Sequence, residues 1–370
     1  MIEAIEAVLR SEIGGYEPMR DAHTFESLGL DSFDLVNLRS ALEAKTGHNI
    51  PDADWVECRR PADLKRYFAN GSATKEAPGS MTSVRRFKIG MPQMAVGGLS
   101  ENWLFKEIGD FHWSLIASGL GVESSQMFDG SGNRLYATFT RFRVETDTPW
   151  SAYGENEDLA ITGSIARYGS GQFMGVFKGT SGTKSFSSTV LSSFSARSSE
   201  GSNSDLRKGQ PVIPPDCPIP ALAEKPPFVQ EYQQRRAQRG NAKEAVFNRI
   251  YEINPYVDIN GVGLLYFAAY PTIADFCEMG HFGRSWPDIA STQIRDVFYF
   301  ANSDASEVLR YRIQSLETAG RLLTTQATLA RADGTPMALI ETQKSVASQW
   351  TQEPTGLANR LLCPVGYDPE

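Results

Sequence analysis

The sequence predicts a multidomain protein: an all-α bundle of the four-helix type, followed by a larger α+β region built from two similar halves. Three observations carry this prediction. Apolar residues recur at helical spacing through the first 70 residues, and a small polar stretch follows them. The rest of the chain twice repeats a strand, a Gly-marked corner, a long apolar helix and a series of strands. At 370 residues the chain is long enough for two or three domains.

The helical bundle is predicted for residues 1–70. Residues 1–13 place their apolar side chains at the spacing of one helix face. After a Gly-Gly break and a loop, Ser32 opens a second amphipathic helix, which we expect to end at Gly47. A third apolar stretch runs to Phe68 and completes a small helical domain.

The most specific motif in the chain is Leu28-Gly29-Leu30-Asp31-Ser32. It resembles the phosphopantetheine site of acyl and peptidyl carrier proteins, and the resemblance implies a 4'-phosphopantetheine arm on Ser32. A serine at a helix start suits this modification, because unpaired backbone N–H groups there favour the added phosphate. The alternative interpretation is that Ser32 is only a helix cap.

The charge of residues 1–75 fits a carrier that docks onto basic partner enzymes. This stretch holds 13 Asp and Glu against 9 Lys and Arg, a net charge of −4, which is half of the formal charge of −8. Such acidity argues against nucleic-acid binding, which needs a basic footprint. We expect Asp31 to face a basic partner, and Leu30 and Phe33 to anchor their loop to the bundle.

A flexible linker is predicted for residues 71–84, because the stretch up to Ser80 is small and polar. Met81 resembles a fresh translation start, so the two parts are joined by either a natural or an engineered fusion.

Composition predicts a cytoplasmic protein without a metal or a membrane partner. No apolar run approaches the ~20 residues of a membrane helix, and the first residues lack the pattern of a secretion signal. The cysteines lie far apart and form no Cys-X-X-Cys pair, so we expect reduced thiols. They are Cys58, Cys217, Cys277 and Cys363.

The α+β region divides into halves at 85–200 and 246–365, joined by a Ser-, Pro- and Arg-rich connector at 201–245. In the first half a strand from Lys88 to Val96 leads to a helix over 101–121. In the second half residues 256–267 lead to a helix that ends near Glu278. Further strands are expected at 135–144, 159–168, 172–178, 185–193, 294–300, 307–317, 322–332 and 336–346. One apolar helix wrapped by a curled sheet is the hot-dog arrangement, so the prediction is a double hot dog.

The halves also resemble known hot-dog sequences. DINGVGLLYFAAYPTIADFCE, at 258–278, resembles the segment that leads into the central helix of hot-dog acyl-thioester enzymes. MPQMAVGGLSENWLFKEIGDFHW and NRLYATFTRF, at 91–113 and 133–142, resemble the bifunctional acyltransferase/decarboxylase family of the leinamycin type. The resemblance covers 84–365. It implies decarboxylation of methylmalonyl-CoA or malonyl-CoA and acyl transfer to a carrier protein, with polyketide synthase enzymes as partners.

Decarboxylating a malonyl-type thioester forms an enolate, so the enzyme needs hydrogen-bond donors at the thioester oxygen. Backbone N–H groups at a helix start supply such donors. Gly97, Gly98 and Leu99 precede the first long helix, where glycine allows substrate close to the backbone. Ser100 and Asn102 add polar side chains. The alternative is a tight turn capped by Ser100, and both interpretations can hold together.

The resemblance also implies a catalytic tyrosine in the first half, either as acyl acceptor or as hydrogen-bond donor to the enolate. Tyr136 is the best match and Tyr153 the second. A phenol with a pKa near 10 is a poor nucleophile, which Arg134 or Arg141 could improve by lowering that pKa. A tyrosine in a strand is more often a core residue.

Other polar residues carry alternative functions. We expect His112 to be a core or surface histidine, and His281, which follows a helix, to have no catalytic role. Asp258 and Asn260 stand where hot-dog thioesterases often carry their acid, and they either support hydrolysis or shape a turn. The alternatives are therefore a thioesterase or dehydratase acting on carrier-bound acyl chains, or a non-catalytic hot dog that docks carriers.

Overall fold

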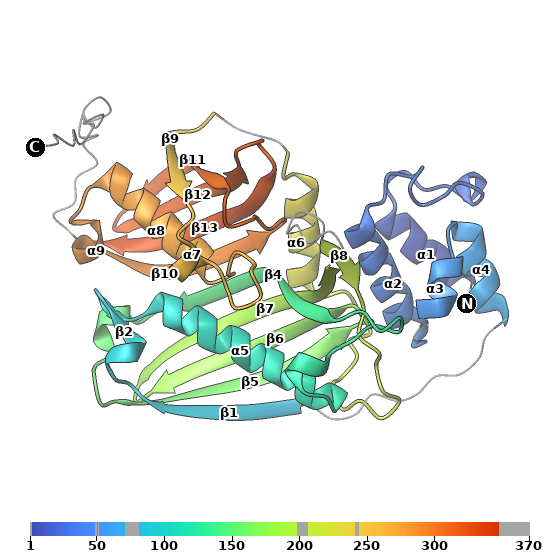
Figure 1. The fold of residues 1–370 in the computed structure, drawn as a ribbon, viewed down its shortest axis with the longest axis horizontal. Coiled ribbons are helices and arrows are strands. Elements are labelled where there is room, and N and C mark those ends of the chain that lie inside the picture. The colour runs from blue at the N-terminus through green and yellow to red at the C-terminus, as the bar shows by residue number, and fades with distance from the viewer. Residues whose placement is uncertain are drawn as a thin grey trace, which may run out of the picture.

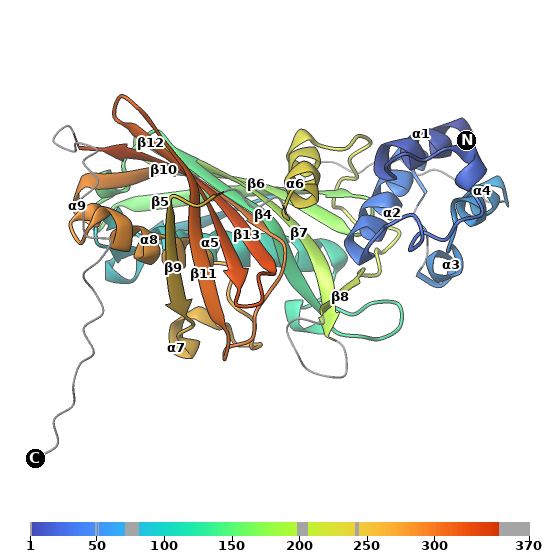
Figure 2. The same cartoon turned by 90° about the horizontal axis from the view of Figure 1, so that it is seen from above.

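The computed structural model describes residues 2–48, 50, 52–70, 81–197, 206–240 and 244–347. These residues form a helical domain at the N-terminus and a large sheet domain, placed end to end (Figures 1 and 2). Most of the predicted linker, the end of the second half and Cys363 lie outside the described residues. Residues 81–84, which the prediction assigned to the linker, are part of the first strand.

The N-terminal domain is a helical bundle, as predicted. Its helices are α1 (Ile2–Glu12), α2 (Ser32–Thr46), α3 (Asp52–Glu57) and α4 (Pro61–Asn70), with a 3-10 turn η1 at Pro18–Arg20. Its core is apolar and includes the fully buried residues Ile5, Leu9, Leu38, Leu42 and Leu64.

Eleven of the described strands in the second region form one antiparallel sheet in the order β1-β5-β6-β7-β4-β10-β13-β12-β11-β9, with β8 paired to β7. The first five in this order and the last five are counterparts, because the order of the second set mirrors that of the first. The seam is the pairing of β4 with β10, from Ile294↔Glu145 to Phe298↔Arg141. The strands are β1 (Met81–Lys88), β4 (Leu135–Thr146), β5 (Asp158–Tyr168), β6 (Gln172–Ser181), β7 (Lys184–Arg197), β8 (Leu206–Gly209), β9 (Phe247–Glu252), β10 (Ala290–Tyr299), β11 (Val308–Ala319), β12 (Leu322–Arg331) and β13 (Pro336–Val346).

Each set of strands carries one long apolar helix on the same side of the sheet (Figure 1). Helix α5 (Glu101–Leu120) lies on the first set and α8 (Ala269–Phe282) on the second, and a single apolar core runs under both. The predicted helices and most predicted strands are therefore present. The remaining short elements are η2 (Met91–Gln93), β2 (Met94–Ala95), β3 (Gly98–Leu99), η3 (Ser124–Gln126), η4 (Trp150–Ala152), α7 (Pro255–Asp258) and α9 (Trp286–Ile289).

Two predicted segments differ in the structure. The strand expected from Lys88 to Val96 is interrupted by η2, where Pro92 cannot donate to a strand ladder, and continues as the β2–β3 hairpin. The connector is not simply extended, since it contains β8 and helix α6 (Pro227–Ala237). Helix α6 forms because its buried residues Val229 and Tyr232 share one face, which packs on the sheet domain.

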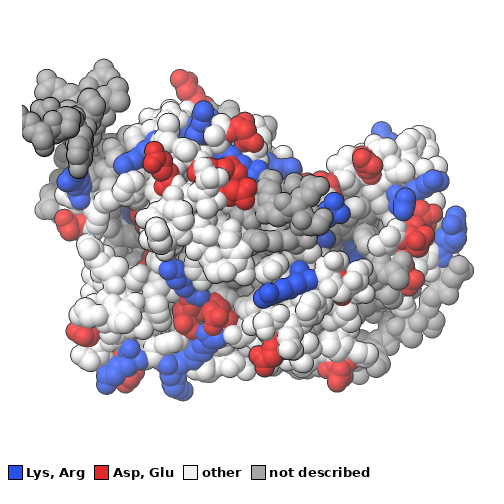
Figure 3. Space-filling view, viewed as in Figure 1, with Lys and Arg blue, Asp and Glu red and all other residues white. Residues whose placement is uncertain are grey.

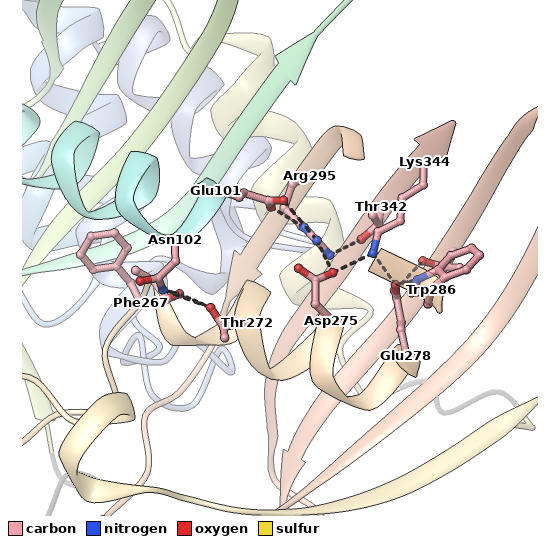
Figure 4. A network of polar contacts seen from close by, with 12 residues as sticks. Glu101, Asn102, Phe267, Thr272, Asp275, Glu278, Trp286, Arg295, Thr342 and Lys344 are labelled. Atoms are coloured by element: carbon pink, nitrogen blue, oxygen red, sulfur yellow. Dashed lines mark hydrogen bonds and ion pairs between the residues drawn. The ribbon is translucent and has the colours of Figure 1, made fainter. Parts of the chain in front are cut away.

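Buried charges connect the two long helices to the sheet (Figure 4). Arg295 of β10, with a side chain 0 % exposed, contacts Glu101 of α5 and Asp275 of α8, each at 2.7 Å. Lys344 of β13 contacts Asp275 and Glu278, also at 2.7 Å. Burial alone would raise the pKa of Asp275, but Arg295 and Lys344 hold it at about 2.

Replacing Arg295 with methionine tests this network. Arg295→Met leaves Glu101 and Asp275 without their shared cation, and removing one partner of a buried pair costs roughly 3–5 kcal/mol. We expect a loss of about 3 kcal/mol in the free energy of unfolding, because Asp275 keeps Lys344. Arg310→Met, at an exposed position of β11, is the control and should change stability by less than about 0.5 kcal/mol. If urea denaturation gave the same loss of stability for Arg295→Met and Arg310→Met, the buried ion pairs would not stabilise the fold.

Candidate functional site: the carrier helix and two cavities

Ser32 lies at the start of α2 with its side chain exposed. The helix cap is its neighbour Asp31, whose carboxylate accepts hydrogen bonds from the backbone N–H groups of Phe33 (2.8 Å) and Asp34 (3.0 Å). The alternative interpretation of Ser32 as a cap is therefore wrong. Its side chain does not cap the helix and has no hydrogen-bond partner among the residues that the structure describes, so it is exposed at a helix start, as attachment of an arm requires.

Phe33 packs against the sheet domain instead of anchoring its loop to the bundle. Its side chain is 1 % exposed and belongs to a cluster with Leu191, Val229, Tyr232, Phe298 and Leu339. Of the two residues predicted to anchor the loop, Leu30 does pack against the bundle core. The prediction failed for Phe33 because an apolar side chain in the first turn of a helix can equally well face a second domain.

The turn between β5 and β6 fits closely against α2. A side chain on Gly169 would overlap the backbone of Ser40, and a Cβ on Gly171 would lie 2.7 Å from Val36 Cγ1. Between these glycines, Ser170 donates to the buried carboxylate of Glu43 through its backbone N–H (2.6 Å) and its hydroxyl (2.7 Å). The helical domain is thus docked through a complementary interface.

Charge complements this packing. Arg236 of α6 contacts Asp31 at 2.5 Å, and Arg239 approaches the same carboxylate at 3.7 Å. Burial opposes ionisation of Asp31, but backbone hydrogen bonds and Arg236 outweigh it and lower its pKa. Asp31 was predicted to face a basic partner enzyme. In the structure it faces basic residues of the same chain, at the end of α6.

A cavity of about 190 Å³ opens beside Phe33, and we call it the carrier-side cavity. Its walls come from both halves of the sheet domain. Residues 137–140 of β4 face residues 299–302 across the point where β4 and β10 separate, beyond the pair Phe298↔Arg141. The start of α8 closes one side through Phe267 and Tyr270.

Most hydroxyl groups of the carrier-side cavity are engaged within the protein. Tyr232, Tyr270 and Tyr299 donate to backbone carbonyl oxygens at 2.9–3.1 Å, and burial raises the pKa of each. Asn260 differs. Its Oδ1 accepts from the backbone N–H groups of Val262 (3.1 Å) and Leu264 (3.0 Å), and its Nδ2 has no partner among the described residues. It therefore offers a hydrogen-bond donor, fixed in orientation, at the wall of the cavity.

A second cavity of about 760 Å³ lies at the opposite end of the sheet domain, and we call it the far cavity. It brings together Gly97, Leu99, Ser100 and Asn102 from the predicted oxyanion corner. Ser100 caps α5 by accepting from Trp103 N (3.2 Å). The side chain of Asn102 donates to the carbonyl of Ala268 at 2.8 Å and to the hydroxyl of Thr272 at 3.1 Å (Figure 4).

Gly98 also has a packing role. Any side chain there would overlap the carbonyl of Trp150, and its φ of 112° favours glycine. The far cavity differs from the carrier-side cavity at one further position. Ala95 follows Met94, which pairs with Leu99, as Asn260 follows Ile259, which pairs with Leu265. The far cavity therefore has an alanine where the carrier-side cavity has the amide of Asn260.

Tyr136 lines neither cavity, so the structure separates it from Ser100 and Asn102. It is half-buried in β4, with the guanidinium of Arg134 5.2 Å from its ring centroid. Arg141 is engaged elsewhere, in a buried ion pair with Asp296 at 2.7 Å. Tyr153 is fully buried against Trp150 and Phe186, and burial raises its pKa.

The remaining candidates have structural surroundings. His112 is fully buried with Nε2 2.8 Å from Ser192 Oγ, and burial lowers its pKa to about 3, so the ring is neutral. His281, in the last turn of α8, packs against Phe247, and burial lowers its pKa as well. Asp258 is 2 % exposed and accepts hydrogen bonds from Tyr251 Oη and Asn254 N, which favours the turn-shaping role.

Sequence reasoning missed Lys208 and Arg236, which lie in the connector and line the carrier-side cavity. The Arg-rich stretch of α6 was a signal, since the carrier motif is acidic and a basic segment of the same chain can meet it. On the face seen in Figure 3, basic and acidic side chains are interspersed, so overall charge gives no such signal.

Comparison with known proteins agrees with this division. Residues 3–68 match the family described as phosphopantetheine attachment site. The N-terminal domain is a carrier domain. This match implies a 4'-phosphopantetheine arm on its serine. Within the described residues, no group of three or more His, Cys, Asp or Glu is placed to hold a metal ion. No described helix has the length and apolar character that a membrane span requires.

The sheet domain is similar to solved thioesterase structures. An oleoyl thioesterase from Lactobacillus plantarum is 11% identical with a TM-score of 0.54, covering 72% of this chain and 97% of that chain. The 12:0-ACP thioesterase from Umbellularia californica is 12% identical with a TM-score of 0.50, covering 72% of this chain and 98% of that chain. At these identities the likeness shows the fold alone: the sheet domain has a hot-dog, thioesterase-like fold.

The docking interface gives a direct prediction. Gly171→Val places a branched side chain against Val36 and Ser40, so we expect the carrier domain to undock while staying folded. Small-angle X-ray scattering should then show a larger maximum dimension than the wild type. Gly240→Val, where a Cβ meets nothing within 4 Å, is the control and should scatter like the wild type. An unchanged profile for Gly171→Val would mean that the glycine fit does not hold the carrier in place.

Proposed function

We propose that the protein is a decarboxylase and acyltransferase of polyketide-type biosynthesis. It decarboxylates a methylmalonyl- or malonyl-type thioester; when the acyl group comes from CoA, the thiol of the arm on its own carrier domain forms the new thioester and CoA leaves as its thiol. The mirrored strand order and the two long helices support a double hot dog for the sheet domain. The observation that carries the proposal is the docking of the carrier helix, through Phe33, at a small cavity shared by both halves.

The carrier-side cavity is the proposed reaction site. Ser32 precedes Phe33 in the first turn of α2, and Phe33 lines the cavity, so an arm on Ser32 starts at its opening. Inside, the amide of Asn260 and the positive end of α8 face the place where a thioester would lie. Donors of this kind stabilise the negative charge that develops on a thioester oxygen.

The lining favours decarboxylation over hydrolysis. Its described residues include no carboxylate, imidazole or thiol, and its one amine, Lys208, lies beside Phe33. Hydrolysis needs a group to activate water or to act as nucleophile. Decarboxylation needs neither: the bond from the α-carbon to the carboxylate breaks, CO₂ leaves, and the electron pair passes to the thioester oxygen as an enolate. A proton from solvent then completes the acyl group.

The size of the cavity fits a short acyl group. Phe139 and Phe267, whose ring centroids are 4.2 Å apart, line it, and both contact Phe142 behind them. At about 190 Å³ the cavity is smaller than the roughly 300–1,000 Å³ of sites for drug-sized ligands. A methylmalonyl or propionyl group is therefore preferred to a long chain.

A thioesterase is the second candidate, favoured by the likeness in fold and by the carboxylates Asp275 and Glu101 at the far cavity. In that case Gly97, Gly98, Leu99, Ser100 and Asn102 form the oxyanion corner. Asp275 is a poor general base, because its ion pairs hold its pKa at about 2. We therefore place the chemistry in the carrier-side cavity.

Intact-mass spectrometry of the loaded carrier tests the proposed reaction. The protein carrying methylmalonyl-phosphopantetheine on Ser32 should lose the mass of CO₂ and keep a propionyl thioester, whereas a thioesterase would leave the free thiol. Ser32→Ala should carry no arm. Gly171→Val, which undocks the carrier, should decarboxylate more slowly than Gly240→Val. A methylmalonyl thioester that stays intact would contradict the proposal.

Asn260 and Tyr136 give opposite predictions. Asn260→Asp keeps the oxygen that accepts from Val262 and Leu264 but replaces the amide donor, so decarboxylation should fall by roughly 10²–10³-fold. Tyr136→Phe removes a hydroxyl outside both cavities and should leave the rate near that of the wild type. Single-turnover rates at saturating substrate measure both. If Tyr136→Phe lost acyl transfer and Asn260→Asp kept it, Tyr136 would be the acyl acceptor and this account would be wrong.

Phe267 should limit the size of the acyl group. Phe267→Leu enlarges the cavity, so the rate with a butylmalonyl thioester relative to methylmalonyl should rise by about 10-fold or more, given ~1–3 kcal/mol per methylene in an apolar pocket. The control is Phe111→Leu, which alters a core contact of α5 with Phe177. The same preference in both variants would show that Phe267 does not set chain length.

A further inference from the structure

Two basic side chains flank the residue that follows the attachment serine. The guanidinium carbon of Arg236, in α6, lies 4.3 Å from the ring centroid of Phe33. The ammonium of Lys208, in β8, lies 5.5 Å from the same centroid. Both side chains line the carrier-side cavity beside Phe33, so a group attached to Ser32 begins one residue away from the ring that this pair of cations flanks.

Arg236 has remaining hydrogen-bonding capacity on this side. One of its terminal nitrogens donates to Asp31 Oδ2 at 2.5 Å, while its Nε is buried and has no partner among the described residues. The other oxygen of Asp31 is already used, because it caps α2. Arg239 lies 3.7 Å from the same carboxylate. Positive charge therefore exceeds what Asp31 can neutralise.

Lys208 has no carboxylate within ion-pair distance in the part of the chain that the structure describes. Its Nζ donates to Ser193 Oγ at 3.0 Å. The charged groups that act on it are Arg236 of α6 and Asp31, the N-cap of α2, while the neighbouring strand β7 contributes the hydroxyls of Ser193 and Ser195. Burial and the charge of Arg236 lower its pKa to about 7. A buried amine that lacks a counterion is costly to keep protonated.

We propose that Lys208 and Arg236 bind the phosphodiester that links the phosphopantetheine arm to Ser32. A phosphodiester carries one negative charge and acceptor oxygens, which suit a guanidinium and an ammonium together. Its binding supplies Lys208 with the counterion that the unmodified protein lacks. It also fixes the first bonds of the arm at the opening of the carrier-side cavity, so the proposal rests on the proposed placement of the arm.

The test compares the unmodified protein with the protein that carries an unacylated arm, and it needs no catalysis. In the unmodified protein the side-chain NMR signals of Lys208 should titrate near pH 7. With the arm attached, the pKa should rise by roughly 1–3 units, the effect of an adjacent opposite charge. In addition, Lys208→Met should shift the ³¹P resonance of the phosphodiester, and Lys208→Arg should largely restore it.

The matched control is Arg207→Met, which removes the exposed neighbour on the opposite face of β8 and should leave the ³¹P resonance unchanged. A Lys208 pKa that is the same with and without the arm would overturn the proposal. A ³¹P resonance insensitive to Lys208→Met would overturn it too. Both readouts are independent of decarboxylation, so failure of the proposed reaction would not affect them.

Discussion

The pairing of β4 with β10 is the contact on which the rest of the sheet domain depends. It joins two sets of strands into one sheet and buries the ion pair of Arg141 and Asp296, each 1 % exposed, at the seam. An unpartnered charge at this depth is costly, so the ion pair favours one alignment of the halves. Beyond Phe298 the two strands separate, and the carrier-side cavity lies in the space between them.

The same seam positions the carrier domain. Arg141 contacts Glu231 of α6 at 2.8 Å, and its guanidinium stacks 3.9 Å from the ring centroid of Phe228, so α6 is fixed against the seam. From there, Arg236 reaches Asp31 and Tyr232 packs against Phe33 with centroids 5.3 Å apart. One continuous set of contacts therefore runs from the centre of the sheet to the attachment serine. This continuity is the physical basis for placing carrier and cavity in one reaction.

Local features were readable from the sequence, and long-range ones were not. Ser32, α5 and most strands follow from a motif and from apolar periodicity, which depend on nearby residues only. The pairing of Glu145 with Ile294 joins distant segments, so no local pattern marks it. For the same reason, side chains that meet across domains, such as Phe33, were assigned to the nearest core. The carrier-side cavity is formed by these long-range contacts. The sequence analysis therefore gave a possible catalytic role only to Asn260 among the residues that line it.

The central claim is that the arm on Ser32 enters the carrier-side cavity of its own chain. A pantetheine analogue with a photoreactive acyl group, attached to Ser32 and irradiated in dilute solution, tests it most directly. We expect cross-links within the same molecule to peptides that contain residues 260–267 and 299–302, which line the cavity. Cross-links to residues 97–102 of the far cavity, or only between separate molecules, would contradict the account.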